Sequence, residues 1–288
     1  MKKWWTIGGA VLLAGWFGLK DTVYRISLQS NAPAVIDPLD YASVDSWAAF
    51  PDAMPPGAWE TPWGVDVFLI GPPAGLSSGP GLVNARIEAH EEKYDAAITE
   101  LSRGIAKGLP LYAPHYHSPS AVHNTGEYAD ETALGLVSAF STYLAEHNRD
   151  RAILLAVDER ALPLADPILA QLTGDAIAER FAGRIIFGSN PSGAAPTACN
   201  PSLNSVCDQT VDMKAGGIPF GFLLPRLPGR ISERSLIDPD GTAEAVAVQA
   251  TQVSSWLDEN GPKPAEPLGD FEEIEIAPVY APDEVITD

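Results

Sequence analysis

The sequence predicts a doubly wound α/β fold, in which helices cover both faces of a mostly parallel sheet. Short, predominantly apolar runs such as VDVFLI (65–70) and AILLAV (152–157) are typical of strands that are buried on both faces. Segments with a helical spacing of apolar residues separate these runs, which favours strand–helix–strand units. The chain has 288 residues, 45% of them hydrophobic, which is enough for a core in one domain of about 230 residues.

The first half of this domain alternates strands with helices. The strand at 65–70 ends at Gly71-Pro72-Pro73, a helix follows over 84–107, and LYAP (111–114) is a second strand. Residues 127–148 form the strongest predicted helix, and Asn148 is a suitable stop for it. The expected apolar stripes are Ile87, Tyr94, Ile98, Leu101 and Ile105 on the first helix, and Leu134, Val137, Phe140, Tyr143 and Leu144 on the second.

The second half is less regular. The strand AILLAV (152–157) is followed by a helix that runs to about Ala182, and RIIFG (184–188) is a fourth strand. An irregular section rich in proline and glycine fills 189–239. A last helix over about 241–259 is expected to bury Ala245, Val248, Val253 and Trp256.

The N-terminal residues 1–20 are expected to be a membrane anchor. Lys2 and Lys3 precede an uncharged run over 4–19, which spans about 24 Å as a helix and is somewhat shorter than a hydrocarbon core of about 30 Å. Flanking lysines can snorkel and tryptophans suit the interface, so a short span is compatible with the run. The alternative is a cleaved signal peptide, but no small-x-small cleavage site directly follows.

This anchor predicts a single-pass protein of the bacterial inner membrane. The N-terminal lysines favour a cytoplasmic N-terminus and a periplasmic body. Small residues at every fourth position of the run, Ala10, Ala14 and Gly18, predict a face for self-association within the membrane. Residues 21–60 then read as a linker and entry segment, 61–262 as the α/β domain and 263–288 as an acidic disordered tail.

Charge and cysteine content restrict the partners and the compartment. The formal net charge is −20, which argues against binding to nucleic acid or to an anionic lipid surface. Cys199 and Cys207 lie in one loop-like stretch, and in an oxidising compartment they predict a local disulfide. The acidic residues after Lys263 are Glu266, Asp270, Glu272, Glu273, Glu275, Asp283, Glu284 and Asp288.

The junction after AILLAV is the first place to look for chemistry. In open parallel sheets functional residues lie at the carboxyl ends of strands, and in α/β hydrolases this strand-to-helix turn is the nucleophile elbow, G-x-S-x-G. The sequence here is Val157-Asp158-Glu159-Arg160-Ala161. Acidic residues at a helix start are also favoured by the helix dipole, so an ordinary charged helix start is the alternative interpretation.

Several segments, in order, resemble a bacterial domain-of-unknown-function family of α/β-hydrolase-like proteins, many with an N-terminal membrane anchor. These segments are YASVDSWAAFPD (41–52), VDVFLIGPP (65–73), LYAPHYHSP (111–119), and FSTYLAEHN (140–148) with RAILLAV (151–157). The resemblance covers about 38–260 and implies a sheet of α/β-hydrolase type preceded by one transmembrane helix. The family motif Gly-His-Ser-Gln-Gly places its serine at Glu159 and its glycines at Val157 and Ala161.

The residues for acyl transfer are therefore missing from the expected positions. All histidines precede the junction, so none follows it to act as general base in the order Ser, Asp or Glu, His. Ser192 in GSNPSG follows a proline and also has no later histidine. A carboxylate nucleophile at Asp158 or Glu159 would need the same base. We therefore expect no catalytic residue at this degenerate elbow.

One histidine group has the spacing of metal ligands. His115 and His117 lie two apart in an extended segment, with His123 nearby, so two imidazoles are able to share a zinc or copper ion. The resembling family has arginine at both of the first two positions, which argues against a conserved metal role. We expect neither a metal nor another cofactor.

These observations predict a membrane-tethered pseudoenzyme that acts as a binding or scaffolding component of the cell envelope. Its expected partners are an envelope or membrane protein, or a small ligand in the residual cleft. One alternative is an active enzyme, either esterase- or lipase-like or a metal-dependent hydrolase with a non-standard site. Another is a structural accessory subunit of a membrane complex.

Overall fold

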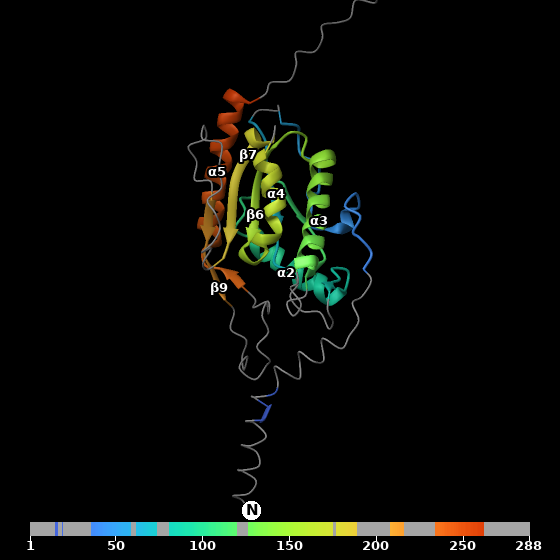
Figure 1. Cartoon of the computed structure of the whole chain (residues 1–288). Coiled ribbons are helices and arrows are strands. Elements are labelled where there is room, and N and C mark those ends of the chain that lie inside the picture. The colour runs from blue at the N-terminus through green and yellow to red at the C-terminus, as the bar shows by residue number, and fades with distance from the viewer. Residues whose placement is uncertain are drawn as a thin grey trace, which may run out of the picture.

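A computed structural model describes residues 36–58, 62–73, 81–119, 126–174, 177–188, 208–215 and 234–261, together with Gly15, Trp16 and Leu19. Within these residues the main sheet has six strands in the order β1-β4-β2-β6-β7-β8 (Figure 1). β1 is antiparallel to β4 and all other pairs are parallel, so the predicted mostly parallel α/β sheet is confirmed. The strands are β1 (Trp47–Ala49), β2 (Val65–Ile70), β4 (Leu111–Pro114), β6 (Ala152–Asp158), β7 (Phe181–Phe187) and β8 (Asp208–Val211).

Two short antiparallel strand pairs and the helices complete the described fold. β3 (Leu82–Val83) pairs with β5 (Ser118–Pro119), and β9 (Met213–Ala215) pairs with β10 (Arg234–Leu236). The long helices are α2 (Glu88–Ser102), α3 (Gly126–Thr142), α4 (Leu162–Gly174) and α5 (Pro239–Asn260). The short turns are η1 (Val44–Ser46), the π-turn η2 (Tyr143–His147), η3 (Glu159–Ala161) and η4 (Ala178–Arg180).

The strand order creates a switch point between β2 and β6. The chain moves from β2 through α2 to β4 on one side, then through α3 back past β2 to β6 and onward to β7. The loops after β2 and β6 therefore lead away from the sheet in opposite directions, which is where ligands bind in open α/β sheets.

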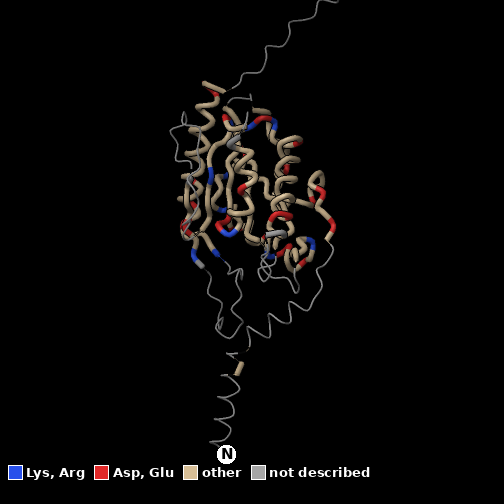
Figure 2. Tube along the Cα trace, in the orientation of Figure 1, with Lys and Arg blue, Asp and Glu red and all other residues tan. Residues whose placement is uncertain are grey.

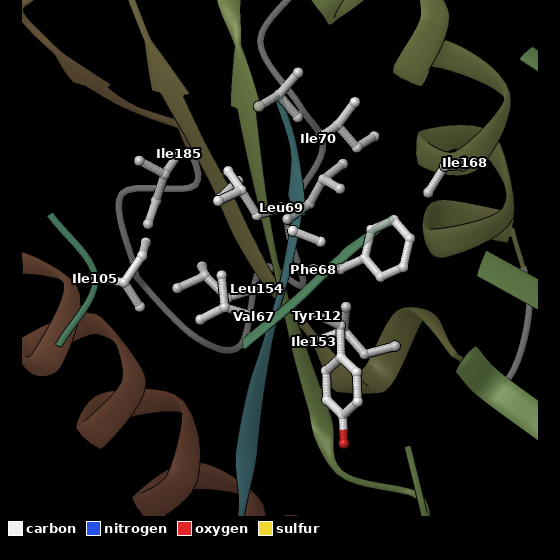
Figure 3. Packing of buried hydrophobic residues seen from close by; sticks show 14 of the residues in the cluster. Val67, Phe68, Leu69, Ile70, Ile105, Tyr112, Ile153, Leu154, Ile168 and Ile185 are labelled. Carbon is white, nitrogen blue, oxygen red and sulfur yellow. The ribbon is translucent and has the colours of Figure 1, made fainter. Parts of the chain in front are cut away.

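Helices cover both faces of this sheet, and side chains alternate between the two faces. Figure 3 shows Phe68 and Ile153 on the side of Ile168 from α4, and Val67 and Leu154 on the side of α5. Every residue of β2, β6 and β7 is buried. Burial on both faces explains why these strands lack polar alternation in the sequence.

The buried stripes of the helices differ from those predicted. Tyr94, Ile98 and Leu101 of α2 are buried as expected, but Ile87 is 49% exposed and Leu134 of α3 is 70% exposed. On α5, Val248 is 52% exposed. The predicted Val253 is buried, and the other buried residues of α5 are Val246, Gln249, Ala250, Ser254 and Leu257.

Two boundaries were also predicted wrongly. α4 ends at Gly174 rather than near Ala182, and β7 begins at Phe181 instead of Arg184. Phe181, Ala182 and Gly183 fit either a helix end or a strand start, and pairing with β6 selects the strand. The sequence did not predict β1, because three residues carry too little periodicity to recognise.

A buried polar network closes the amino end of the sheet. The Asp66 side chain is fully buried and accepts hydrogen bonds from Arg151 Nε at 2.6 Å, Tyr143 Oη at 3.0 Å and Asn148 Nδ2 at 3.2 Å. Burial raises the pKa of Asp66, while the Arg151 guanidinium opposes that rise. The π-turn η2 places Tyr143 and Asn148, five residues apart, on the same buried carboxylate. Asn148 caps this turn, which confirms the predicted stop of the helix.

The described domain begins near the carboxyl ends of the strands and finishes near their amino ends. Near its start, the Asp37 carbonyl lies 3.0 Å from His117 Nε2, just beyond the carboxyl end of β4. At its finish, α5 packs beside Trp63, whose amide donates to Asp258 Oδ1 at 2.9 Å at the amino end of β2. In the part of the chain that the structure describes, no helix has the length and apolar character needed to span a bilayer.

Several predicted features lie outside the described residues. They are Ala10, Ala14, Gly18, His123, Ser192, Cys199, Cys207 and the tail 263–288.

Candidate functional site

The candidate site lies where the carboxyl ends of the parallel strands meet. Asp158 is the last residue of β6, and Glu159 and Arg160 begin η3 directly after it. Gly71 follows β2 and Gly188 follows β7 at the same edge. Figure 2 shows acidic and basic residues gathered at this edge, near the junction between β6 and α4.

Asp158 is held by the residue two places after it. Its carboxylate is 1% exposed, and Oδ1 accepts from the Arg160 amide at 2.9 Å and from Arg160 Nε at 2.7 Å. Oδ2 accepts from Arg160 Nη2 at 2.8 Å, so both oxygens are bound. Burial lowers the pKa of Arg160, but hydrogen bonding and pairing with Asp158 raise that pKa by more. Arg160 is therefore charged, and the Asp158 side chain caps the first turn of η3.

Glu159, the residue directly after β6, forms an ion pair with Arg234 of β10. The two side chains are only 16% and 17% exposed. A Cβ on Gly188 would lie 2.1 Å from Glu159 Oε2, so the glycine at the end of β7 provides the space that this carboxylate occupies. The ion pair therefore joins the β6 junction to the small β9–β10 sheet.

The backbone at Glu159 differs from a nucleophile elbow. Asp158 is extended, with φ −65° and ψ 135°, and Glu159 starts a short 3-10 turn. Among the described residues, the non-glycine residues with positive φ are Arg149 and Asp150, both remote from this turn in sequence. Since an elbow projects its nucleophile by backbone strain, this junction is instead an ordinary strand-to-helix turn.

Two tyrosines occupy the neighbouring ends of β2 and β4. Tyr94 Oη donates to the Pro114 carbonyl at 2.8 Å and accepts from the Gly71 amide at 3.3 Å. Tyr116 Oη donates to the Gly71 carbonyl at 2.7 Å. Burial raises the pKa of both phenols, so they are neutral. Tyr94 therefore binds the first backbone amide after β2.

His115 is buried against α2 at the same edge. It is 4% exposed, and its Nε2 lies 3.5 Å from Asp95 Oδ1 and 4.0 Å from Glu91 Oε1. Burial lowers the pKa of His115, and the two carboxylates only partly offset this effect. The imidazole is therefore neutral near pH 7.

His117 is used differently, although it lies only two residues away. Its Nδ1 accepts from the Ala85 amide at 3.1 Å, so the proton is assigned to Nε2, which donates to the Asp37 carbonyl at 3.0 Å. Both nitrogens are thus engaged with backbone and no lone pair is left for a metal. β4 ends before His115, at Pro114, so strand alternation does not extend over these two histidines.

The described residues contain no group of three or more His, Cys, Asp and Glu side chains that would hold a metal ion. His115 and His117 contact different partners, and His123 lies outside the described residues.

Sequence reasoning located the junction but missed its partners. Arg234 lies in the section that was read as irregular, and no local pattern links it to Glu159. Tyr94 was identified only as a core residue of its helix, although its hydroxyl reaches two backbone groups. Gly71 and Gly188, which follow β2 and β7, were the signals in the sequence of a close approach at this edge.

Comparisons of the chain with protein-family models, curated proteins and solved structures gave no match.

Proposed function

We propose that this chain is a non-hydrolytic binding protein on an α/β-hydrolase-like scaffold, tethered to the bacterial inner membrane with its body in the periplasm. The observation that carries the proposal is the pairing of both junction carboxylates, Asp158 with Arg160 and Glu159 with Arg234. A nucleophile must be free to attack, and breaking a mostly buried ion pair is costly.

The strand order supports the hydrolase-like part of the proposal. A parallel sheet with β2 between β4 and β6, edged by an antiparallel strand beside β4, is compatible with a hydrolase-type sheet. The segments with family resemblance correspond to β1, β2, β4 and β6 in chain order. The tether itself rests on the uncharged run at 4–19, and self-association through Ala10, Ala14 and Gly18 belongs to that part of the proposal.

The arrangement of bases also favours binding over hydrolysis. His115 contacts Asp95 and Glu91 of α2, and His117 is bound to backbone through both nitrogens. No metal or cofactor is needed for a binding role. Its partner is either an envelope or membrane protein or a small ligand at the carboxyl edge of the sheet.

Activity measurements on the full-length protein in detergent test this proposal. We expect no fluorophosphonate labelling and no turnover of short-chain p-nitrophenyl esters, with Glu159→Gln and Ser192→Ala indistinguishable from the unmodified protein. Labelling or turnover that is lost in either variant would show that the chain is a hydrolase. Turnover that a chelator abolishes and His115→Ala removes would instead establish the metal-dependent alternative.

A further inference from the structure

The Arg160 guanidinium binds Asp158 through the edge formed by Nε and Nη2, and its other edge includes the buried Nη1. Nε and Nη2 bind the two oxygens of Asp158. Nη1 is buried from solvent and has no hydrogen-bond partner among the residues that the structure describes. A guanidinium carries five N–H donors in a fixed planar fork, so the edge formed by Nη1 and Nη2 retains donors in a buried place. Leaving such a charged donor unpaired is unfavourable, which predicts an acceptor there.

None of the described polar groups around it supplies that acceptor. Both oxygens of Asp158 are bound by other donors of Arg160, and Glu159 is paired with Arg234. The Tyr116 hydroxyl donates to the Gly71 carbonyl and Tyr94 donates to the Pro114 carbonyl, and neither oxygen accepts from Arg160 Nη1. Arg160 lies close enough to Tyr116 for the guanidinium charge to oppose the rise in the phenol pKa. Among these groups the unmet requirement is therefore for an acceptor, not for a cation.

From this geometry we infer that the carboxyl edge of the sheet binds a small ligand bearing an oxyanion, a carboxylate or a phosphate, through the Nη1 edge of Arg160. The inference rests on the proposed binding function and names its ligand class. Carboxylate and phosphate oxygens match the spacing of two parallel guanidinium N–H bonds. The edge also lies at the switch point between β2 and β6, where open α/β sheets bind ligands.

The charge balance defines what kind of anion fits. Asp158 neutralises Arg160, so attraction comes from directed hydrogen bonds more than from net charge. Recognition should then depend on oxyanion geometry and little on salt, and chloride should not compete. The net charge of −20 disfavours a polyanion such as nucleic acid, so the ligand is a small molecule.

Thermal unfolding of the full-length protein in detergent tests the site. Inorganic phosphate and acetate are added separately, with sodium chloride at matched ionic strength as reference. We expect at least one of them to raise Tm by roughly 2–4 °C. A shift with phosphate alone indicates a phosphate-bearing ligand, and a shift with acetate alone indicates a carboxylate.

Substitutions of Arg160 test whether the shift in Tm arises from anion binding at this residue. Arg160→Lys keeps the charge but removes the planar fork, so the shift should disappear. Arg103→Lys is the matched control, because Arg103 is 56% exposed and pairs only with Glu100. If Arg160→Lys does not fold, the charge-balanced double variant D158N/R160Q replaces it.

Two results would overturn the inference: no shift with either anion, or a shift that survives in the Arg160 variants. Ester turnover measured on the same samples separates this outcome from the proposed function. A silent protein without a shift keeps the binding proposal and loses the oxyanion site, whereas ester turnover removes the binding proposal itself.

Discussion

The imidazole of His147 lies in an aromatic cluster between β1, β4 and η2. Its ring centroid is 5.0 Å from Phe50, and it stacks on Tyr112 at 6.1 Å with an interplanar angle of 16°. Trp47 adds an edge contact at 6.1 Å. Both ring nitrogens are buried and have no hydrogen-bond partner in the described part of the chain. Burial lowers the pKa of His147, and Glu146 offsets part of this effect.

This environment predicts a loss of stability in acid. An unfolded histidine titrates near pH 6.5, and the folded pKa lies below that value, so between the two the unfolded chain binds more protons. The contribution is complete above about pH 6.5 and is lost as the pH falls towards the folded pKa. His147→Phe keeps the aromatic contacts and should reduce the fall in unfolding free energy between pH 7.5 and 5, measured by urea denaturation. Parallel pH curves for the two proteins would show that His147 titrates normally.

Asn148, the residue that follows η2, joins this turn to the buried Asp66 network through its side chain. Asn148 Nδ2 lies within hydrogen-bond distance of Asp66, Tyr143 Oη and the Arg151 carbonyl, while its Oδ1 accepts from Arg180 Nη1 at 2.9 Å. We expect Asn148→Ala to lower the free energy of unfolding by about 2–4 kcal/mol, because it leaves several buried groups unpaired. Urea denaturation measures the change.

A matched control exists at the end of α5. Asn260 is the last residue of its helix, and its side-chain hydrogen bond to the Trp256 carbonyl at 2.9 Å is exposed. Asn260→Ala should change stability by less than about 0.5 kcal/mol. Equal effects of the two substitutions would show that the Asp66 network contributes little.

At the same scale, strands were easier to predict than helix faces. β2 and β4 match their predicted ranges because both-face burial removes polar residues from the run. The face predicted for α5 was only partly right: Val253 is buried and Val248 is exposed. Its buried side also includes Ser254 and Gln249, which donates to the Ala182 carbonyl at 2.8 Å. Periodicity alone cannot distinguish buried polar residues, which form tertiary hydrogen bonds, from polar residues that face solvent.

For the site, the sequence placed the junction residues but not their partners. The strand-to-helix pattern of the sequence predicts that Asp158, Glu159 and Arg160 lie at the end of β6 and the start of the next helix. The pairing of Glu159 with Arg234 depends on how a distant strand returns to the same edge. Such a contact is a property of the tertiary fold, so no local signal encodes it.

The whole molecule carries a large excess of negative charge. The net charge is −20, and the eight acidic residues after Lys263 account for −8, which leaves −12 for residues 1–263. Mutual repulsion of these charges opposes the compact state, and added salt screens it. We expect Tm to rise between low and near-physiological sodium chloride, while the buried Asp66–Arg151 pair is little affected.

Differential scanning calorimetry at fixed pH measures this dependence. Salt screens the buried pair little, so the rise in Tm should come from the surface charges. Glu88 is exposed, so Glu88→Gln should reduce the salt effect slightly. A Tm that falls with salt would mean that attractive ion pairs outweigh the repulsion.

The opposite positions of the two domain ends have a mechanical consequence. The chain enters beside His117, beyond the carboxyl end of β4, and α5 ends beside Trp63 at the amino end of β2. If the proposed tether and a partner on the C-terminal side both hold the chain, a pull between them acts along the strands. Such a load shears neighbouring strands, so that the hydrogen bonds between them resist together instead of opening one after another. The described domain would then resist tension along the axis that joins its two ends.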